Sequence, residues 1–172
     1  MQTFLPHPEF FESARCLDAK RLGKQRVETK QILIALGVPV GDHLGNSDSS
    51  WRNHPAVLMW KGHEAQLAQY GLVMCHVWAK RGFKDTLYPQ FKDALIYCIN
   101  DCRFGLTNPN WLGFDKLHAS HRSNLLRKDY AYYRQFGWQE PPDLPYFWPR
   151  TKESDLCQQL TDTAEPAPAG RT

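Results

Sequence analysis

Apolar residues that recur with the period of an α-helix, in runs that end at glycine or proline, constrain this sequence most. The first long run stops at Gly37 and Pro39. At about 100° per residue, one face of this run carries Leu22, Thr29, Ile32, Leu33 and Leu36. No alternating strand pattern of convincing length and no internal repeat is present. The sequence therefore predicts an all-α fold.

The order of these runs predicts one compact domain. Pro6 and Pro8 favour an extended N-terminus. We expect a helix, with or without a break, from there to residue 36, a helix start at 54–55 leading into 64–80, and helices over about 85–98 and 116–136. The proline-rich segment after Gly137 is expected to be irregular. We assign residues 1–150 to the domain and expect a disordered tail over 151–172.

Composition excludes several classes of protein. The net charge of +3 is too small to prove an anionic partner, so the distribution of charge matters more. Five cysteines without a C-x-x-C pair indicate reduced thiols and a cytoplasmic protein. The N-terminus lacks the features of a signal peptide, and no apolar run is long enough to span a membrane.

The segment between residues 15 and 30 has six cations and only two acids, Asp18 and Glu28. Glu28 falls at the edge of the apolar face, so we expect the core to shelter it on one side. In the simpler interpretation, Lys24 and Glu28 form an i,i+4 pair worth about 0.2–0.5 kcal/mol. In the alternative, the basic face binds phosphates and the carboxylate is kept for chemistry. Composition alone leaves both interpretations open.

Four segments of the sequence, taken together and in order, resemble a known family, and this resemblance favours the second interpretation. The four segments are residues 21–28 (RLGKQRVE), 80–86 (KRGFKDT), 118–129 (HASHRSNLLRKD) and 130–138 (YAYYRQFGW). The set resembles the pyrimidine-dimer DNA glycosylase and abasic-site lyase family of the phage UV-repair type, over roughly residues 1–138. The resemblance implies a compact all-α fold, and an N-terminal α-amine that attacks C1′ of the damaged nucleotide to give a Schiff base. It also implies that Glu28 assists and that β-elimination can cut the strand.

The position of the nucleophile depends on how the N-terminus is processed. Gln2 is bulky and favours retention of Met1, so the Met1 amine is the first candidate. Processing that exposes Gln2 or Thr3 is the second, and Lys20 or Lys24 is the third. An α-amine has an ordinary pKa of about 7.7–8.0, well below that of lysine, so more of it is neutral near pH 7.

Double-stranded DNA is the expected partner. Basic residues would hold phosphates, and aromatic residues would fill the space left by an unstacked base. His54 is expected either to start a helix or to meet the site. His118 and His121 lie at i,i+3, but no acidic partner is evident, so we expect no metal. The candidate DNA-contact residues are Arg21, Lys24, Arg26, His54, His121, Arg122, Lys128, Tyr133 and Trp138.

These observations predict a monomeric DNA glycosylase and abasic-site lyase without metal or cofactor, acting on a damaged or modified pyrimidine. A pyrimidine dimer is the favoured substrate. The alternatives are a glycosylase for another modified base, a DNA-binding protein without enzymatic activity, and a helical protein-interaction domain.

Overall fold

The structure is a computed structural model and describes residues 1–149. The regular elements within these residues are helices. They are α1 (Phe10–Cys16), α2 (Ala19–Ala35), α3 (Pro55–Trp60), α4 (Glu64–Lys80), α5 (Tyr88–Asn100), α6 (Asp115–Lys128), α7 (Tyr130–Tyr133) and the 3-10 helix η1 (Arg134–Phe136). Within residues 1–149 there is no β-strand, only an isolated bridge between Val40 and His43. The all-α prediction is confirmed. The tail expected over 151–172 lies outside the described residues.

The first helical run is two helices, separated at Leu17 and Asp18. The Asp18 side chain accepts a hydrogen bond from the backbone nitrogen of Arg21 at 3.0 Å and so caps α2. The break expected as one alternative is therefore present. The buried face of α2 carries Leu22, Thr29, Ile32 and Leu33, as the periodicity predicted.

The last helical run differs from the single helix expected over 116–136. Asp129 has an extended φ of −161° and ends α6, and its side chain accepts from the backbone nitrogen of Tyr132 at 3.2 Å. A short polar side chain here competes with the helical hydrogen bonds and starts a new helix. Gly137, with φ at 66°, closes η1 as predicted.

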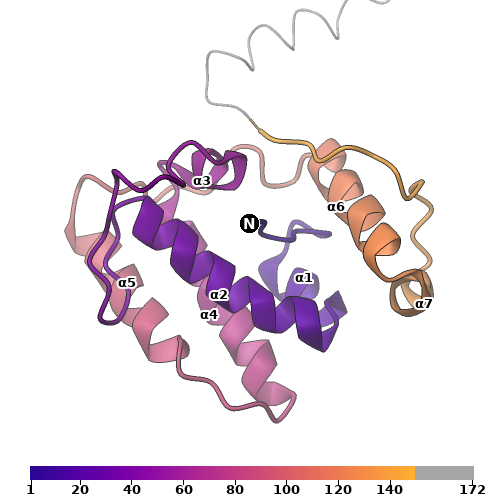
Figure 1. Ribbon diagram of the computed structural model, residues 1–172, viewed down its shortest axis with the longest axis horizontal. Helices are drawn as coiled ribbons and strands as arrows, with labels where there is room; N and C mark the ends of the chain where they lie inside the picture. The colour runs from indigo at the N-terminus through magenta and orange to yellow at the C-terminus, as the bar shows by residue number, and fades with distance from the viewer. Residues whose placement is uncertain (150–172) are drawn as a thin grey trace, which may run out of the picture.

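The helices form two groups with the N-terminal segment between them. In one group α4 packs against α1, α2 and α5. The other group is α6 with α7 and η1. Figure 1 shows the N-terminus between α2 on one side and α6 on the other, with the segment after η1 returning along α6 toward α3.

The N-terminal segment is extended, as predicted, and it is bound by buried polar side chains. The Phe4 nitrogen donates to Gln25 Oε1 at 2.7 Å, and the Leu5 nitrogen donates to Nδ1 of His121 at 2.8 Å. The Leu5 oxygen lies 2.7 Å from Nδ1 of His118. A buried backbone group without a hydrogen-bond partner carries a desolvation penalty. The side chains from α2 and α6 offset this penalty for the N-terminal segment.

Gly71 on α4 gives a test of the packing against α5. A Cβ atom at this position would lie 2.9 Å from the Phe91 ring. Overpacking costs about 1–3 kcal/mol, while glycine-to-alanine in a helix gains up to about 1 kcal/mol. We expect Gly71→Ala to lower the free energy of unfolding by about 1–2 kcal/mol, measured by urea denaturation. The exposed α4 variant Gln69→Ala should change it little, and a stabilised Gly71→Ala would contradict this packing.

His121 gives a test of the N-terminal anchor through pH. Burial, with a smaller contribution from His118, lowers the pKa of His121 to about 3. Below about pH 6.5 the unfolded chain binds a proton at this ring that the folded protein does not. The free energy of unfolding should therefore fall as the pH drops from about 6.5 toward 4, by up to about 1.4 kcal/mol per pH unit from this group.

His121→Asn isolates this contribution, because the asparagine oxygen can still accept from the Leu5 nitrogen. Chemical denaturation of both proteins between pH 4.5 and 7.5 is the measurement. We expect the variant to be less stable at pH 7.5 but to lose less stability on acidification. Parallel pH profiles would show that His121 is not the buried neutral group described.

Candidate active site

The centre of α2 presents a buried carboxylate beside the start of the chain. Glu28 is only 6% exposed, although it lies in the most basic part of the sequence. Gln25, one turn earlier on the same buried face, donates to Glu28 Oε2 at 3.3 Å. Lys24 points outward, is 68% exposed, and its Nζ lies 3.5 Å from Glu28 Oε1. The expected sheltering of Glu28 at the edge of the core is confirmed.

The N-terminus completes this arrangement. The Met1 amine lies 3.9 Å from Glu28 Oε1, and the Gln2 backbone nitrogen donates to Glu28 Oε2 at 3.3 Å. The Met1 side chain is only 4% exposed, whereas the residue as a whole is partly exposed. Its accessible surface is therefore largely backbone, which begins at the amine. A primary amine and a carboxylate thus lie close together, in a residue that keeps some accessible surface.

Cations surround this pair on the side of α6. Arg21 donates to Asp18 Oδ2 at 2.7 Å and to the Lys128 carbonyl at 3.0 Å, so α2 and the end of α6 are joined here. Burial lowers the pKa of Lys128, and the nearby Arg127, Arg21 and Lys24 lower it further. Lys24 and Lys128 are exposed. The structure therefore brings Arg21 to the end of α6 at Lys128, while Lys24 pairs with Glu28.

His54 starts a helix, as one of the two expectations had it, while a role in the site stays a prediction. Its Nδ1 accepts from the Ala56 nitrogen at 3.1 Å and caps α3. Partial burial lowers the pKa of His54, and the Met1 amine lowers it further, while Glu28 acts in the opposite direction. The half-buried ring therefore lies within electrostatic reach of both members of the amine–carboxylate pair.

Three candidate DNA-contact residues lie in the interior instead. Arg26 is ion-paired with Asp85 and packs over the Trp78 ring, with its Cζ 4.8 Å from the ring centroid. His121 is fully buried against the N-terminal segment. Tyr133 is fully buried and donates to Asp18 Oδ2 at 2.5 Å, and burial raises its pKa. These side chains have partners within the protein, and their direct contact with DNA stays a prediction.

Two further candidates lie at the edge of the interior. Arg122 donates to the Pro6 carbonyl at 2.9 Å and to Glu140 Oε1 at 2.6 Å, so it joins the N-terminal segment to the chain after η1. Trp138 is half-buried and stacks on Tyr133 at 5.7 Å between ring centroids and an interplanar angle of 14°. Neither residue makes a contact with Met1 or Glu28 that the structure records among residues 1–149.

Three residues that lie near Glu28 or His54 were not predicted from the sequence. Gln25 could have been found, because it lies three residues before Glu28 and so shares its side of the helix. Tyr146 and Trp148 follow a proline-rich segment with no periodic pattern, and nothing local places them. Burial raises the pKa of Tyr146 to about 12, and Glu28 also acts in that direction. Tyr146 therefore lies within electrostatic reach of Glu28.

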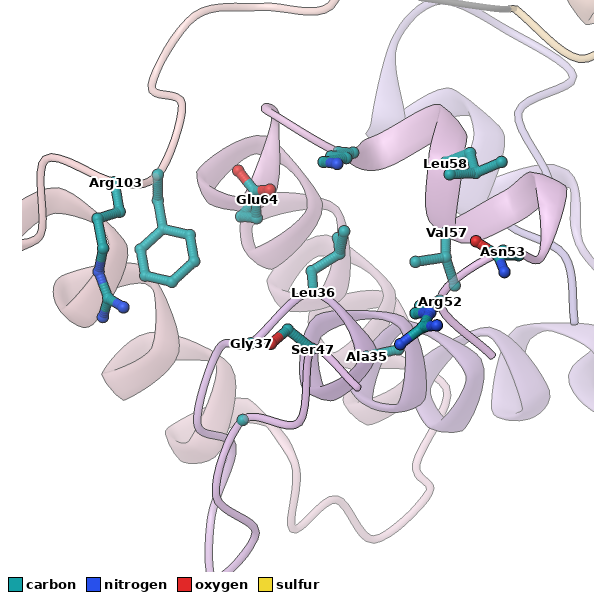
Figure 2. A pocket seen from close by; sticks show the side chains of 13 residues that line it. Ala35, Leu36, Gly37, Ser47, Arg52, Asn53, Val57, Leu58, Glu64 and Arg103 are labelled. Atoms are coloured by element: carbon teal, nitrogen blue, oxygen red, sulfur yellow. The ribbon is translucent and has the colours of Figure 1, made fainter. Parts of the chain in front are cut away.

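A cavity of about 490 Å³ lies elsewhere, beyond the C-terminal end of α2 (Figure 2). Leu36, Val57 and Phe104 contribute apolar surface to it, and Arg52, Lys61 and Arg103 contribute cations. Met1 and Glu28 do not line it. Within residues 1–149 no group of three or more His, Cys, Asp or Glu side chains is placed to hold a metal ion, and no helix is long and apolar enough to cross a membrane.

One family of known proteins matches the half of the chain that contains Met1 and Glu28. The family model described as pyrimidine dimer DNA glycosylase matches residues 1–88 of the 172. Searches of curated proteins and of solved structures found no significant match. The matched region contains Met1, Lys24, Glu28 and His54. The chain, whose matched half carries both Met1 and Glu28, belongs to the pyrimidine dimer DNA glycosylase family.

Proposed function

We propose that the protein removes a pyrimidine-dimer base from duplex DNA through a Schiff base at the Met1 amine, and then cuts the strand as an abasic-site lyase. The observation that carries the proposal is the position of the Met1 amine, 3.9 Å from the buried Glu28 carboxylate. Membership of a DNA glycosylase family supports a substrate of this kind. The partial exposure of Met1 supports access of a sugar carbon to the amine.

The chemistry requires an amine that shares its electron pair and a carboxylate that handles protons. The amine nitrogen bonds to C1′ as the bond from C1′ to the base breaks, and the base leaves with that electron pair. The nitrogen then loses a proton, and its electron pair forms the C=N bond as the bond from C1′ to the ring oxygen O4′ breaks. O4′ takes the electron pair of that bond and a proton, so the ring opens and the imine is formed. Glu28, near both the amine and the attacked carbon, stabilises the positive charge that develops on the sugar and accepts the proton.

Two hydrogen bonds to the Glu28 carboxylate support this role. The Gln2 nitrogen and the Gln25 amide each donate to Oε2, and these bonds orient the carboxylate. Oε1 is left facing the Met1 amine and Lys24. One carboxylate oxygen therefore holds the group in place while the other faces the reacting atoms.

The exposed cations beside the pair are proposed to bind the DNA backbone. Lys24 and Lys128 are exposed, and Arg21 is held near them by Asp18 and Asp129. Each phosphate that these side chains neutralise adds salt-sensitive affinity. Once imine formation has made the C2′ proton acidic, its loss expels the 3′ phosphate and cuts the strand by β-elimination.

Borohydride trapping tests the nucleophile. The purified full-length protein is incubated with a duplex that carries one abasic site, reduced, digested and analysed by mass spectrometry. We expect the sugar adduct on the amine of Met1, because this is the amine next to Glu28. An adduct on Lys20 or Lys24 would move the nucleophile to a side chain, and no adduct would contradict the imine mechanism.

Glu28→Gln tests the carboxylate. A group that transfers protons in the transition state contributes about 100- to 10,000-fold, so we expect excision and strand cutting to fall by at least about 100-fold. Affinity for the duplex should persist or rise, because one negative charge is removed from a basic surface. Single-turnover cleavage and fluorescence anisotropy at one salt concentration measure the two effects.

Glu12→Gln is the matched control, because Glu12 is an exposed glutamate on α1 that pairs with Arg15. This variant should cleave and bind like the unmodified protein. If Glu28→Gln retains full activity, the proposed role of Glu28 is wrong. If the unmodified protein binds DNA tightly but neither excises nor cuts, the protein is a DNA-binding member without the chemistry.

A further inference from the structure

The cavity beyond the C-terminal end of α2 has walls that are held by close approaches of backbone to backbone. A Cβ atom at Gly45 would collide with the carbonyl oxygen of Gly37, and one at Gly105 would collide with that of Gly62. Glycine carries no Cβ atom, so the chain can pass this close only at such positions. The cavity therefore follows from the packing of the chain and is formed before a ligand binds.

Glu64 holds one side of the cavity through its carboxylate. The residue is 5% exposed, and its Oε1 accepts from the Gly62 nitrogen at 2.8 Å while its Oε2 accepts from the Gly105 nitrogen at 3.2 Å. Among the lining residues, which all lie within 1–149, Glu64 is the one acid. Both of its oxygens already have backbone donors, so part of its negative charge is compensated within the protein.

The cations of the wall are less fully paired. Lys61 is exposed and has no ion-pair partner in the described part of the chain. Nη1 of Arg52 lies 3.5 Å from Asp48 Oδ1, and both of these side chains are exposed, so the pair is weak. Arg103 donates to Asp101 through Nε at 3.0 Å and Nη2 at 2.6 Å, which leaves Nη1 without a hydrogen bond within residues 1–149. The cavity therefore presents unused donors of positive charge.

Apolar side chains lie beside these cations. Figure 2 shows Arg52 and Arg103 on opposite sides of the cavity, with Leu36 between them. Phe104 is half-buried, and Leu58 keeps 43% of its surface exposed, which is unusual for a leucine in a wall of a cavity. A ligand that enters the cavity therefore meets both charge and apolar surface.

A small organic phosphate fits this combination. Guanidinium groups bind phosphate through a planar fork of donors, and lysine adds a point charge. The volume of about 490 Å³ lies within the range of about 300–1,000 Å³ that is usual for small-molecule sites. A nucleoside monophosphate has a phosphate for the cations and a ring and sugar for the apolar wall, whereas a double helix is too wide to enter.

We propose that this cavity binds a free nucleoside monophosphate, with its phosphate at the cations of the wall and its nucleoside against the apolar side chains. The amine–carboxylate pair does not line the cavity, so this is a second site. The inference does not depend on the proposed reaction, because binding here is measured without any excision or cutting of DNA.

Isothermal titration calorimetry of the full-length protein at low salt measures the binding. The probes are thymidine 5′-monophosphate, thymidine and inorganic phosphate. We expect the nucleotide to bind at one site and more tightly than either of its parts, because both charge and apolar surface contribute. Its affinity should fall as salt is added, since salt screens the exposed cations. No binding of the nucleotide, or equally tight binding of inorganic phosphate, would overturn the proposal.

Two exposed positions separate the two contributions. Lys61→Gln removes one cation and should weaken binding of the nucleotide by about ten-fold. Leu58→Ser removes apolar surface and should weaken binding of the nucleotide but not of inorganic phosphate. Both side chains are exposed, so the variants should fold, and thermal unfolding without ligand verifies this. Unchanged affinity in both variants would show that the nucleotide does not bind in the cavity.

Control variants separate this site from general attraction to positive charge. Lys92→Gln is the matched control, because Lys92 is an exposed lysine on α5 that does not line the cavity, and its affinity should be unchanged. Lys24→Gln, beside Glu28, should also bind normally. Equal loss in Lys92→Gln and Lys61→Gln, or loss in Lys24→Gln alone, would overturn the assignment. Displacement of the nucleotide by an abasic-site duplex would show that the cavity belongs to the DNA surface instead.

Discussion

The burial of an extended chain terminus between two groups of helices is the constraint on which the rest of the structure depends. Thr3 and Leu5 are fully buried, yet an extended segment cannot satisfy its own backbone groups. Polar side chains on α2 and α6 satisfy them instead, through Gln25, His118 and His121. Because those side chains are themselves fixed in the core, the position of Met1 relative to Glu28 follows from the packing of both helix groups.

This arrangement explains why polar residues occupy positions that a simple helical bundle would fill with apolar ones. Tyr70 donates to Gln25 Oε1 and Trp60 donates to Thr3, so the network extends from the terminus into α3 and α4. A satisfied polar network specifies one arrangement more strictly than apolar packing does. In the proposed reaction, an amine–carboxylate geometry set by many such bonds needs little reorganisation.

Sequence patterns predicted the parts of this protein that depend on neighbours along the chain. The helix ends before Gly82 and Gly137 and the position of Glu28 at the edge of the core follow from local rules. The partner of Arg26 is Asp85, 59 residues away, and the partner of Tyr133 is Asp18, 115 residues away. The contact between the His54 and Trp148 rings likewise joins the start of α3 to the last described segment. Such pairings depend on tertiary packing, which periodicity does not encode.

The buried Met1 side chain has a consequence for how this protein can be produced and modified. Because the side chain is enclosed, the amine lies at a fixed point against Glu28. A formyl group, an acetyl group or an affinity tag joined to that nitrogen would abolish its basicity and would have to fit in the same confined space. Under the function proposed above, maturation of the first residue is then part of assembling the site, and a fusion partner belongs at the other end of the chain.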